Sequence, residues 1–147
     1  MAKLKSLVKD LERGLKEATR EAAADIQLDL KLNGPYWTGE FEGNWVARVG
    51  QVNIPATKDG PEERPKTPEP RAITPPVVPN PKGLNGYTIG NLSSYRDVAL
   101  DLLPGRIKKE GGGTARQDWY DLYLTNQIDK TIGKAVDRSL EAEGFSR

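Results

Sequence analysis

Residues 4–32, LKSLVKDLERGLKEATREAAADIQLDLKL, carry the longest regular pattern in the chain and decide its fold. Apolar residues recur there every three or four positions, which places them on one face of a helix: Leu4, Leu7, Leu11, Leu15, Ala18, Ala22, Ile26 and Leu30. At about 1.5 Å per residue this helix would be roughly 40 Å long, more than a small core covers. We therefore predict that part of its apolar face contacts another subunit; the alternative is a surface helix with frayed ends.

Glycine and proline mark the end of this helix, and the pattern that follows is typical of strands. After Asn33, Gly34 is expected to adopt the left-handed conformation that closes many helices, and Pro35 cannot continue the turn. Apolar and polar residues alternate over residues 41–54, which predicts a strand, with a bend or a pairing with itself near Gly50 as the alternative to a straight course. A second strand is expected over residues 87–92.

The segment between the two expected strands is rich in proline. Residues 55–82 hold nine of the eleven prolines, and each proline removes a backbone donor and fixes φ. The segment is therefore expected to be an extended arm that other chains hold in place, the alternative being a disordered loop. The arm residues predicted to make contacts between subunits or with other proteins are Pro61, Pro65, Pro68, Pro70, Pro75, Pro76 and Pro79.

Two further helix signals complete the chain. Ser94 and Asp97 indicate a short helix that Pro104 and Gly105 would end, and a capping box at Thr114–Gln117 opens a final helix that Gly144 would end. The order predicts a single α+β domain over residues 1–147. In it, a long N-terminal helix and a C-terminal helix pack on a small antiparallel β-sheet, with residues 55–82 as a proline-rich extended arm.

The amino-acid composition excludes several classes of function. The chain has 147 residues, a formal charge of +1 and neither cysteine nor histidine, which removes thiolate, disulfide and imidazole chemistry. The glycines at 111–113 lack the lysine and hydroxyl residue of a phosphate-binding loop. Asp118 and Asp121 have the spacing of a solvated helix face rather than of a catalytic pair. We predict a protein that is not an enzyme, needs no cofactor or metal and does not contact a membrane.

Two small groups of residues are candidates for a binding role. Arg106, Lys108 and Lys109 form a basic cluster that could line a channel for DNA or be an ordinary solvated loop. The spacing of Trp37, Phe41 and Trp45 favours anchors of the core or of a subunit contact over base stacking.

The order of these pieces resembles the neck (tail-completion) proteins of tailed bacteriophages, which lie at the head–tail junction. The resemblance covers nearly the whole chain apart from the arm, and it begins with the long charged helix and ends with the C-terminal helix. Between them it rests on Thr38, Gly39, Phe41, Trp45, Ile89, Asn91, Tyr95, Leu100, Asp101 and Gly105.

The resemblance implies a structural virion protein that forms a ring, expected to be a hexamer. As a tail terminator or head–tail connector, the ring would join the portal side of the capsid to the tail and let DNA pass as cargo. Its partners would be copies of itself and other neck and tail proteins (a connector or stopper, the tail tube or sheath). The protein would be found in the virion after assembly in the host cytoplasm. The alternative is a non-enzymatic adaptor whose proline-rich arm binds a partner protein, for which residues 65–68 offer one Pro-x-x-Pro motif.

Overall fold

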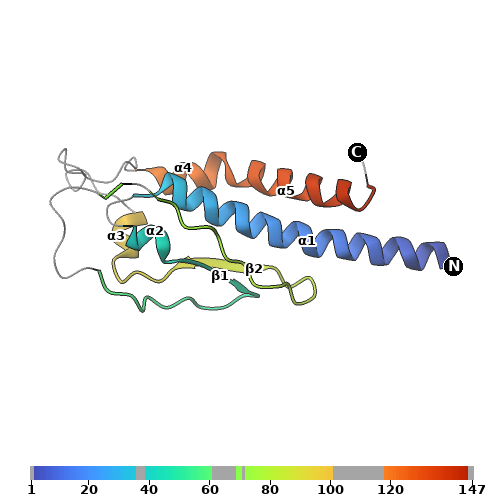
Figure 1. Ribbon diagram of the computed structural model, residues 1–147, viewed down its shortest axis with the longest axis horizontal. Coiled ribbons are helices and arrows are strands. Elements are labelled where there is room, and N and C mark those ends of the chain that lie inside the picture. The colour runs from blue at the N-terminus through green and yellow to red at the C-terminus, as the bar shows by residue number, and fades with distance from the viewer. Residues whose placement is uncertain (1, 36–38, 61–68, 71, 101–117, 146–147) are drawn as a thin grey trace.

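The computed structural model describes residues 2–35, 39–60, 69–70, 72–100 and 118–145. Within these ranges it is an α+β fold with a long N-terminal helix, a two-stranded antiparallel sheet and C-terminal helices, as the sequence predicts (Figure 1). The elements are α1 (Ala2–Asn33), α2 (Glu40–Gly43), β1 (Trp45–Val49), β2 (Tyr87–Asn91), α3 (Arg96–Leu100), α4 (Trp119–Asn126) and α5 (Ile128–Ala142). No helix among these ranges is long and apolar enough to cross a bilayer.

α5 packs antiparallel along α1 because small residues let the two helices approach closely (Figure 1). A Cβ atom added to Gly14 would lie 3.2 Å from Leu140 Cδ2, and Ala18 and Ala22 are buried on the same helix. Ion pairs frame this contact: Arg13 Nε donates to Glu143 Oε1 at 2.8 Å. Small side chains and flanking ion pairs therefore define the part of α1 that α5 covers.

A buried polar cluster joins α1 to both C-terminal helices. The carboxylate of Asp29 accepts hydrogen bonds from the Tyr123 hydroxyl at 3.0 Å and from Thr131 Oγ1 at 2.7 Å. The pKa of the Tyr123 hydroxyl is raised, first by burial and further by its bond to Asp29. Tyr123 therefore stays a neutral donor, and the cluster fixes the angle at which α4 and α5 meet α1.

The end of α1 differs from the expectation. Gly34 does not adopt the left-handed conformation; its N–H donates to Leu30 O at 3.0 Å. A Cβ atom at Gly34 would lie 2.8 Å from Leu30 O and 3.1 Å from the Trp119 ring. This position therefore needs glycine because Trp119 packs on its backbone, and not because of its φ angle.

The predicted strand over residues 41–54 is wrong at both ends. Gly39 has φ 86° and leads into the helical turn α2, so Phe41 is helical. In a strand, Phe41 and Trp45 would lie about 13 Å apart. The helical turn brings their ring centroids to 5.7 Å, edge to face, and both side chains are buried. At the other end, Gly50 has φ 81° and turns the chain out of the strand.

β1 and β2 pair in a simple register, with Trp45 opposite Asn91 and Val49 opposite Tyr87. The segment that follows Gly50 crosses the face of the sheet away from α1 (Figure 1). There the buried Ile54 packs on Gly90, where a Cβ atom would lie only 2.9 Å from Ile54 Cδ1. The residues at the end of the predicted strand thus cover the sheet instead of extending it.

The main core lies at the C-terminal end of α1. Its buried members are Leu30, Phe41, Trp45, Ala99, Trp119 and Tyr123. The Trp119 indole N–H donates to Ala99 O at 2.9 Å, which ties α4 to the short helix α3. The predicted final helix is interrupted at Gln127 (φ −123°), which separates α4 from α5, and Gly144 follows the end of α5 with φ 86°. The expected helix start at residues 114–117 and the expected stop at 104–105 lie outside the described residues.

Candidate functional site

The structure places only some of the residues that the sequence singles out. Phe41 and Trp45 are 6 % and 4 % exposed and belong to this chain's own core. Pro70, Pro75 and Pro79 are exposed and Pro76 is half-buried. The others lie outside the described residues: Trp37, Pro61, Pro65, Pro68, Arg106, Lys108 and Lys109.

The end of the predicted arm is fastened to the body of the domain through Thr74. The Thr74 N–H and hydroxyl donate to Glu42 Oε1 at 2.9 and 2.7 Å. In turn, Lys31 Nζ donates to Thr74 O at 3.1 Å and to Thr74 Oγ1 at 2.6 Å. One threonine therefore joins an acidic side chain from α2 to a basic side chain from α1.

Lys31 and Glu42 also form a buried ion pair. Their charged atoms lie 3.4 Å apart, and the side chains are only 3 % and 1 % exposed. A buried charge is costly unless a partner and further hydrogen bonds compensate it, and Thr74 supplies those bonds. The segment around Thr74 is thus part of the folded domain, because lifting it would leave this pair without those bonds.

A cavity of about 530 Å³ lies beside this ion pair, between α1, β1 and the segment from Thr74 to Pro79. Its lining includes Gln27, Trp45 and Val77. The Gln27 amide donates to Trp45 O at 2.7 Å, at the edge of β1 that faces away from β2. Gln27 Oε1 and Trp45 Nε1 are buried and have no hydrogen-bond partner in the described part of the chain. The cavity is mostly apolar, with the side chains of Lys31 and Thr74 as polar groups in its lining, and it offers a binding surface.

Carboxylates do not gather into a metal site. In the described ranges no group of three or more Asp and Glu residues lies close enough to hold a metal ion. Asp118 and Asp121 are both exposed at the start of α4.

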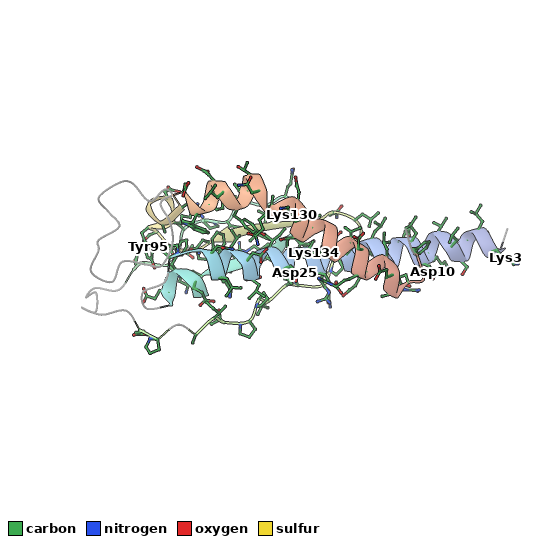
Figure 2. The ribbon with its side chains drawn as sticks, turned by 90° about the horizontal axis from the view of Figure 1, so that it is seen from above. Lys3, Asp10, Asp25, Tyr95, Lys130 and Lys134 are labelled. Atoms are coloured by element: carbon green, nitrogen blue, oxygen red, sulfur yellow. The ribbon has the colours of Figure 1, made fainter. Side chains whose placement is uncertain are left out.

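The first twelve residues of α1, Ala2–Arg13, extend past the end of α5 and are called the overhang here. Near the C-terminal end of α5, Leu140 and Glu143 lie against Gly14, and Glu143 also binds Arg13, the last residue of the overhang. Both figures show α1 continuing beyond this point as a single helix, and Figure 2 labels Lys3 at its tip and Asp10 near its base. The overhang is about 18 Å long.

The overhang carries a row of exposed, large apolar side chains. Leu4, Leu7, Val8 and Leu11 are 59 %, 51 %, 46 % and 40 % exposed. At 100° per residue they lie on one face of the helix. Isolated exposed leucines are common on protein surfaces, but a contiguous row marks an interaction surface.

Sequence reasoning found part of this arrangement. The apolar row was visible in the helical spacing, yet its uncovered part depends on where α5 ends, which no local pattern shows. Lys31, Glu42 and Thr74 were missed altogether. In a sequence, a buried lysine and a buried glutamate look like ordinary surface charges, and Thr74 lies 32 residues from the glutamate that binds it.

No protein-family model, curated protein sequence or solved structure matches this chain. The cavity beside Lys31, the exposed apolar row of the overhang and the sequence therefore carry the information on function.

Proposed function

We propose that this protein is a structural subunit that assembles with copies of itself, and that it forms a ring in the neck of a tailed bacteriophage. In that role it is a tail terminator or head–tail connector, with other neck and tail proteins as partners and DNA as passing cargo. The observation that carries the proposal is the overhang, a helical extension whose large apolar residues are exposed in the described structure.

The energetics favour association over a solitary overhang. Complete burial of a leucine or valine side chain is worth roughly 1.5–3 kcal/mol relative to full exposure. Since the four side chains are about half exposed, covering them offers roughly 3–6 kcal/mol per copy. In addition, a helical segment of this length is marginally stable by itself in water. A partner that covers the apolar face would stabilise both the contact and the helix.

The remaining parts of the proposal come from the sequence. Within residues 55–82, Thr74 is fastened to its own domain, so the prolines that precede it are assigned to contacts with neighbouring subunits or neck proteins. Arg106, Lys108 and Lys109 are assigned to the DNA passage. The resemblance to neck proteins supplies the ring and its expected hexameric state.

Two measurements test the proposal. Light scattering on the full chain, at concentrations from about 1 to 500 μM, should show a transition from monomer to a discrete oligomer. Mass spectrometry of phage particles purified from cells that carry the gene should detect the chain in a fixed ratio to a major tail protein. A chain that is monomeric throughout and absent from the particles would overturn it.

The alternative function is an adaptor whose Pro65 and Pro68 bind a partner domain, and it has a test of its own. Replacing both prolines with alanine would abolish binding to a polyproline-reading domain if the adaptor function is correct. The same double variant should leave self-association through the overhang unchanged.

A further inference from the structure

The overhang has the size and charge pattern to pair with a second copy of itself. We infer that two overhangs pack side by side in opposite directions, so that Leu4 of one copy lies opposite Leu11 of the other and the two Val8 residues meet near the centre. The inference rests on the proposed self-assembly and names the surface that makes the contact.

The length of the overhang fits this pairing. The uncovered part of α1 begins where α5 ends, so the exposed apolar face of each copy is as long as the overhang of the other copy. α5 runs antiparallel to α1 (Figure 1). A second overhang that packs antiparallel on this face continues the line of α5. The tip of each overhang then meets the C-terminal end of the other copy's α5, where Glu141 and Glu143 lie. The positive N-terminal end of one helix thus faces the negative C-terminal end of another.

The side chains of the overhang also have the size that such a pair needs. Where α5 covers α1, Gly14 meets Leu140, and Ala18 and Ala22 are buried further along the same helix; small residues of this kind suit two helices at close approach. The overhang instead presents leucine and valine, which suit a partner helix that offers side chains of the same size. Another overhang has these side chains at the same spacing.

The charges beside the apolar row set the direction of the pair. At 100° per residue, Lys3 and Asp10 lie on one flank of the apolar row, and Lys5 and Glu12 lie on the other. In an antiparallel pair related by a twofold axis each flank faces the same flank of the second copy. Lys3 then lies near Asp10 of the other copy, and Lys5 near Glu12 of the other copy. In a parallel pair, Lys3 would instead lie near Lys5.

These charges are available for such contacts. Lys3, Lys5 and Glu12 make no ion pair with any other residue that the structure describes, and all three are exposed. Asp10 accepts from Arg13 at 2.8 Å through one carboxylate oxygen, which leaves the second oxygen for a lysine. Figure 2 shows Lys3 at the tip of α1, clear of α5, and Asp10 beside the end of α5.

The expected affinity is modest. Two helical segments of this length bury less than the roughly 1,200 Å² at the lower end of specific interfaces. The pair should therefore dissociate at micromolar concentration. A twofold contact links only two subunits, so a ring needs a second interface to close. The twofold contact would then join two rings through the tips of their overhangs.

Cysteine cross-linking tests the direction and register directly, because the natural chain contains no cysteine. Three single variants of the full chain are needed: L4C, V8C and L11C. Under mild oxidation V8C should form a covalent dimer with itself. L4C should form little dimer with itself but should link to L11C when the two are mixed. All three positions are exposed, so circular dichroism should show native folding.

Each other outcome overturns the pairing. Efficient linking of L4C to itself would show parallel helices. If none of these links form while light scattering still shows an oligomer, the overhang is not the contact, yet the proposed self-assembly survives. If the chain is monomeric at every concentration and no links form, both proposals fail.

Discussion

The two ends of α1 share one apolar periodicity but have opposite surroundings. From Gly14 onward, small residues pack under α5, and at the far end Lys31 makes specific polar contacts with Glu42 and Thr74. Ahead of Gly14, larger apolar residues are exposed, and most charged side chains make no ion pair with other described residues. The difference arises because α1 has 32 residues whereas α5 has 15. One end of the helix thus belongs to this chain's own core, and the other end presents its apolar residues exposed.

The largest expected effect comes from breaking the buried ion pair at the covered end. E42A should lower the free energy of unfolding by about 3–5 kcal/mol, because it removes the carboxylate that pairs with the buried Lys31 side chain. Urea denaturation at pH 7 measures this loss, with E12A on the overhang as the matched control. The control should change stability by less than about 0.5 kcal/mol.

A double variant sharpens this first prediction. Replacing both charged residues, in K31M/E42L, should recover much of the stability lost in E42A, because no buried charge remains. A loss of less than about 1 kcal/mol in E42A would contradict the assignment of a compensated ion pair.

The next effect tests why Gly34 is glycine. G34A should destabilise the domain by about 1–3 kcal/mol, because its Cβ would overlap Leu30 O and press on the Trp119 ring. G133A in α5 is the matched control, since a Cβ there meets nothing within 4 Å. Helix propensity predicts that G133A gains up to about 1 kcal/mol. Thermal unfolding of both variants measures the contrast, and equal effects of the same sign would show that local propensity governs both sites.

The exposed end of α1 should respond in association and not in stability. L11D should raise the dissociation constant of the oligomer at least tenfold, because it places a charge in the apolar row. Its free energy of unfolding, measured at a concentration where the chain is monomeric, should stay within about 0.5 kcal/mol of the natural chain. L84D provides the control, as Leu84 is 58 % exposed and far from the overhang in sequence. If L84D weakens the oligomer as much as L11D, the overhang is not the specific contact.

The same contrast explains what the sequence predicted and what it did not. The long helix, the second strand and the α+β class followed from periodicity, which depends only on neighbouring residues. The strand ends were wrong because Gly39 and Gly50 adopt positive φ and the Phe41 ring packs on Trp45, a choice made by tertiary contact. Hence the local pattern was sufficient to predict which helices and strands form. It was insufficient where tertiary packing, or the end of a distant helix, determines where an element stops or which face is exposed.

The candidate site shows this limit most clearly. Lys31, Glu42 and Thr74 come together from three separate segments, and each charge taken alone has the character of a surface residue. The burial of Lys31 and Glu42 can be recognised only when Thr74 is placed beside them in the folded chain. In contrast, the apolar row of the overhang is encoded locally, and only its exposure required the position of α5.

The smallest expected effect concerns the boundary between the two ends of α1, where Arg13 meets Glu143. The bond to Arg13 lowers the pKa of the Glu143 carboxyl below its ordinary value. A carboxyl whose pKa is lower in the folded state contributes stability above its unfolded pKa, and this contribution disappears as the pH falls through the folded pKa. The pair is solvent-exposed, so the contribution is small. E143Q should therefore be slightly less stable than the natural chain at pH 7 and equal to it at pH 2.5, measured by urea midpoints. E141Q, at an exposed position with no ion pair in the described structure, should show no such convergence. A difference between E143Q and the natural chain that persists unchanged at pH 2.5 would mean that Glu143 acts through packing on Gly14 and not through its charge.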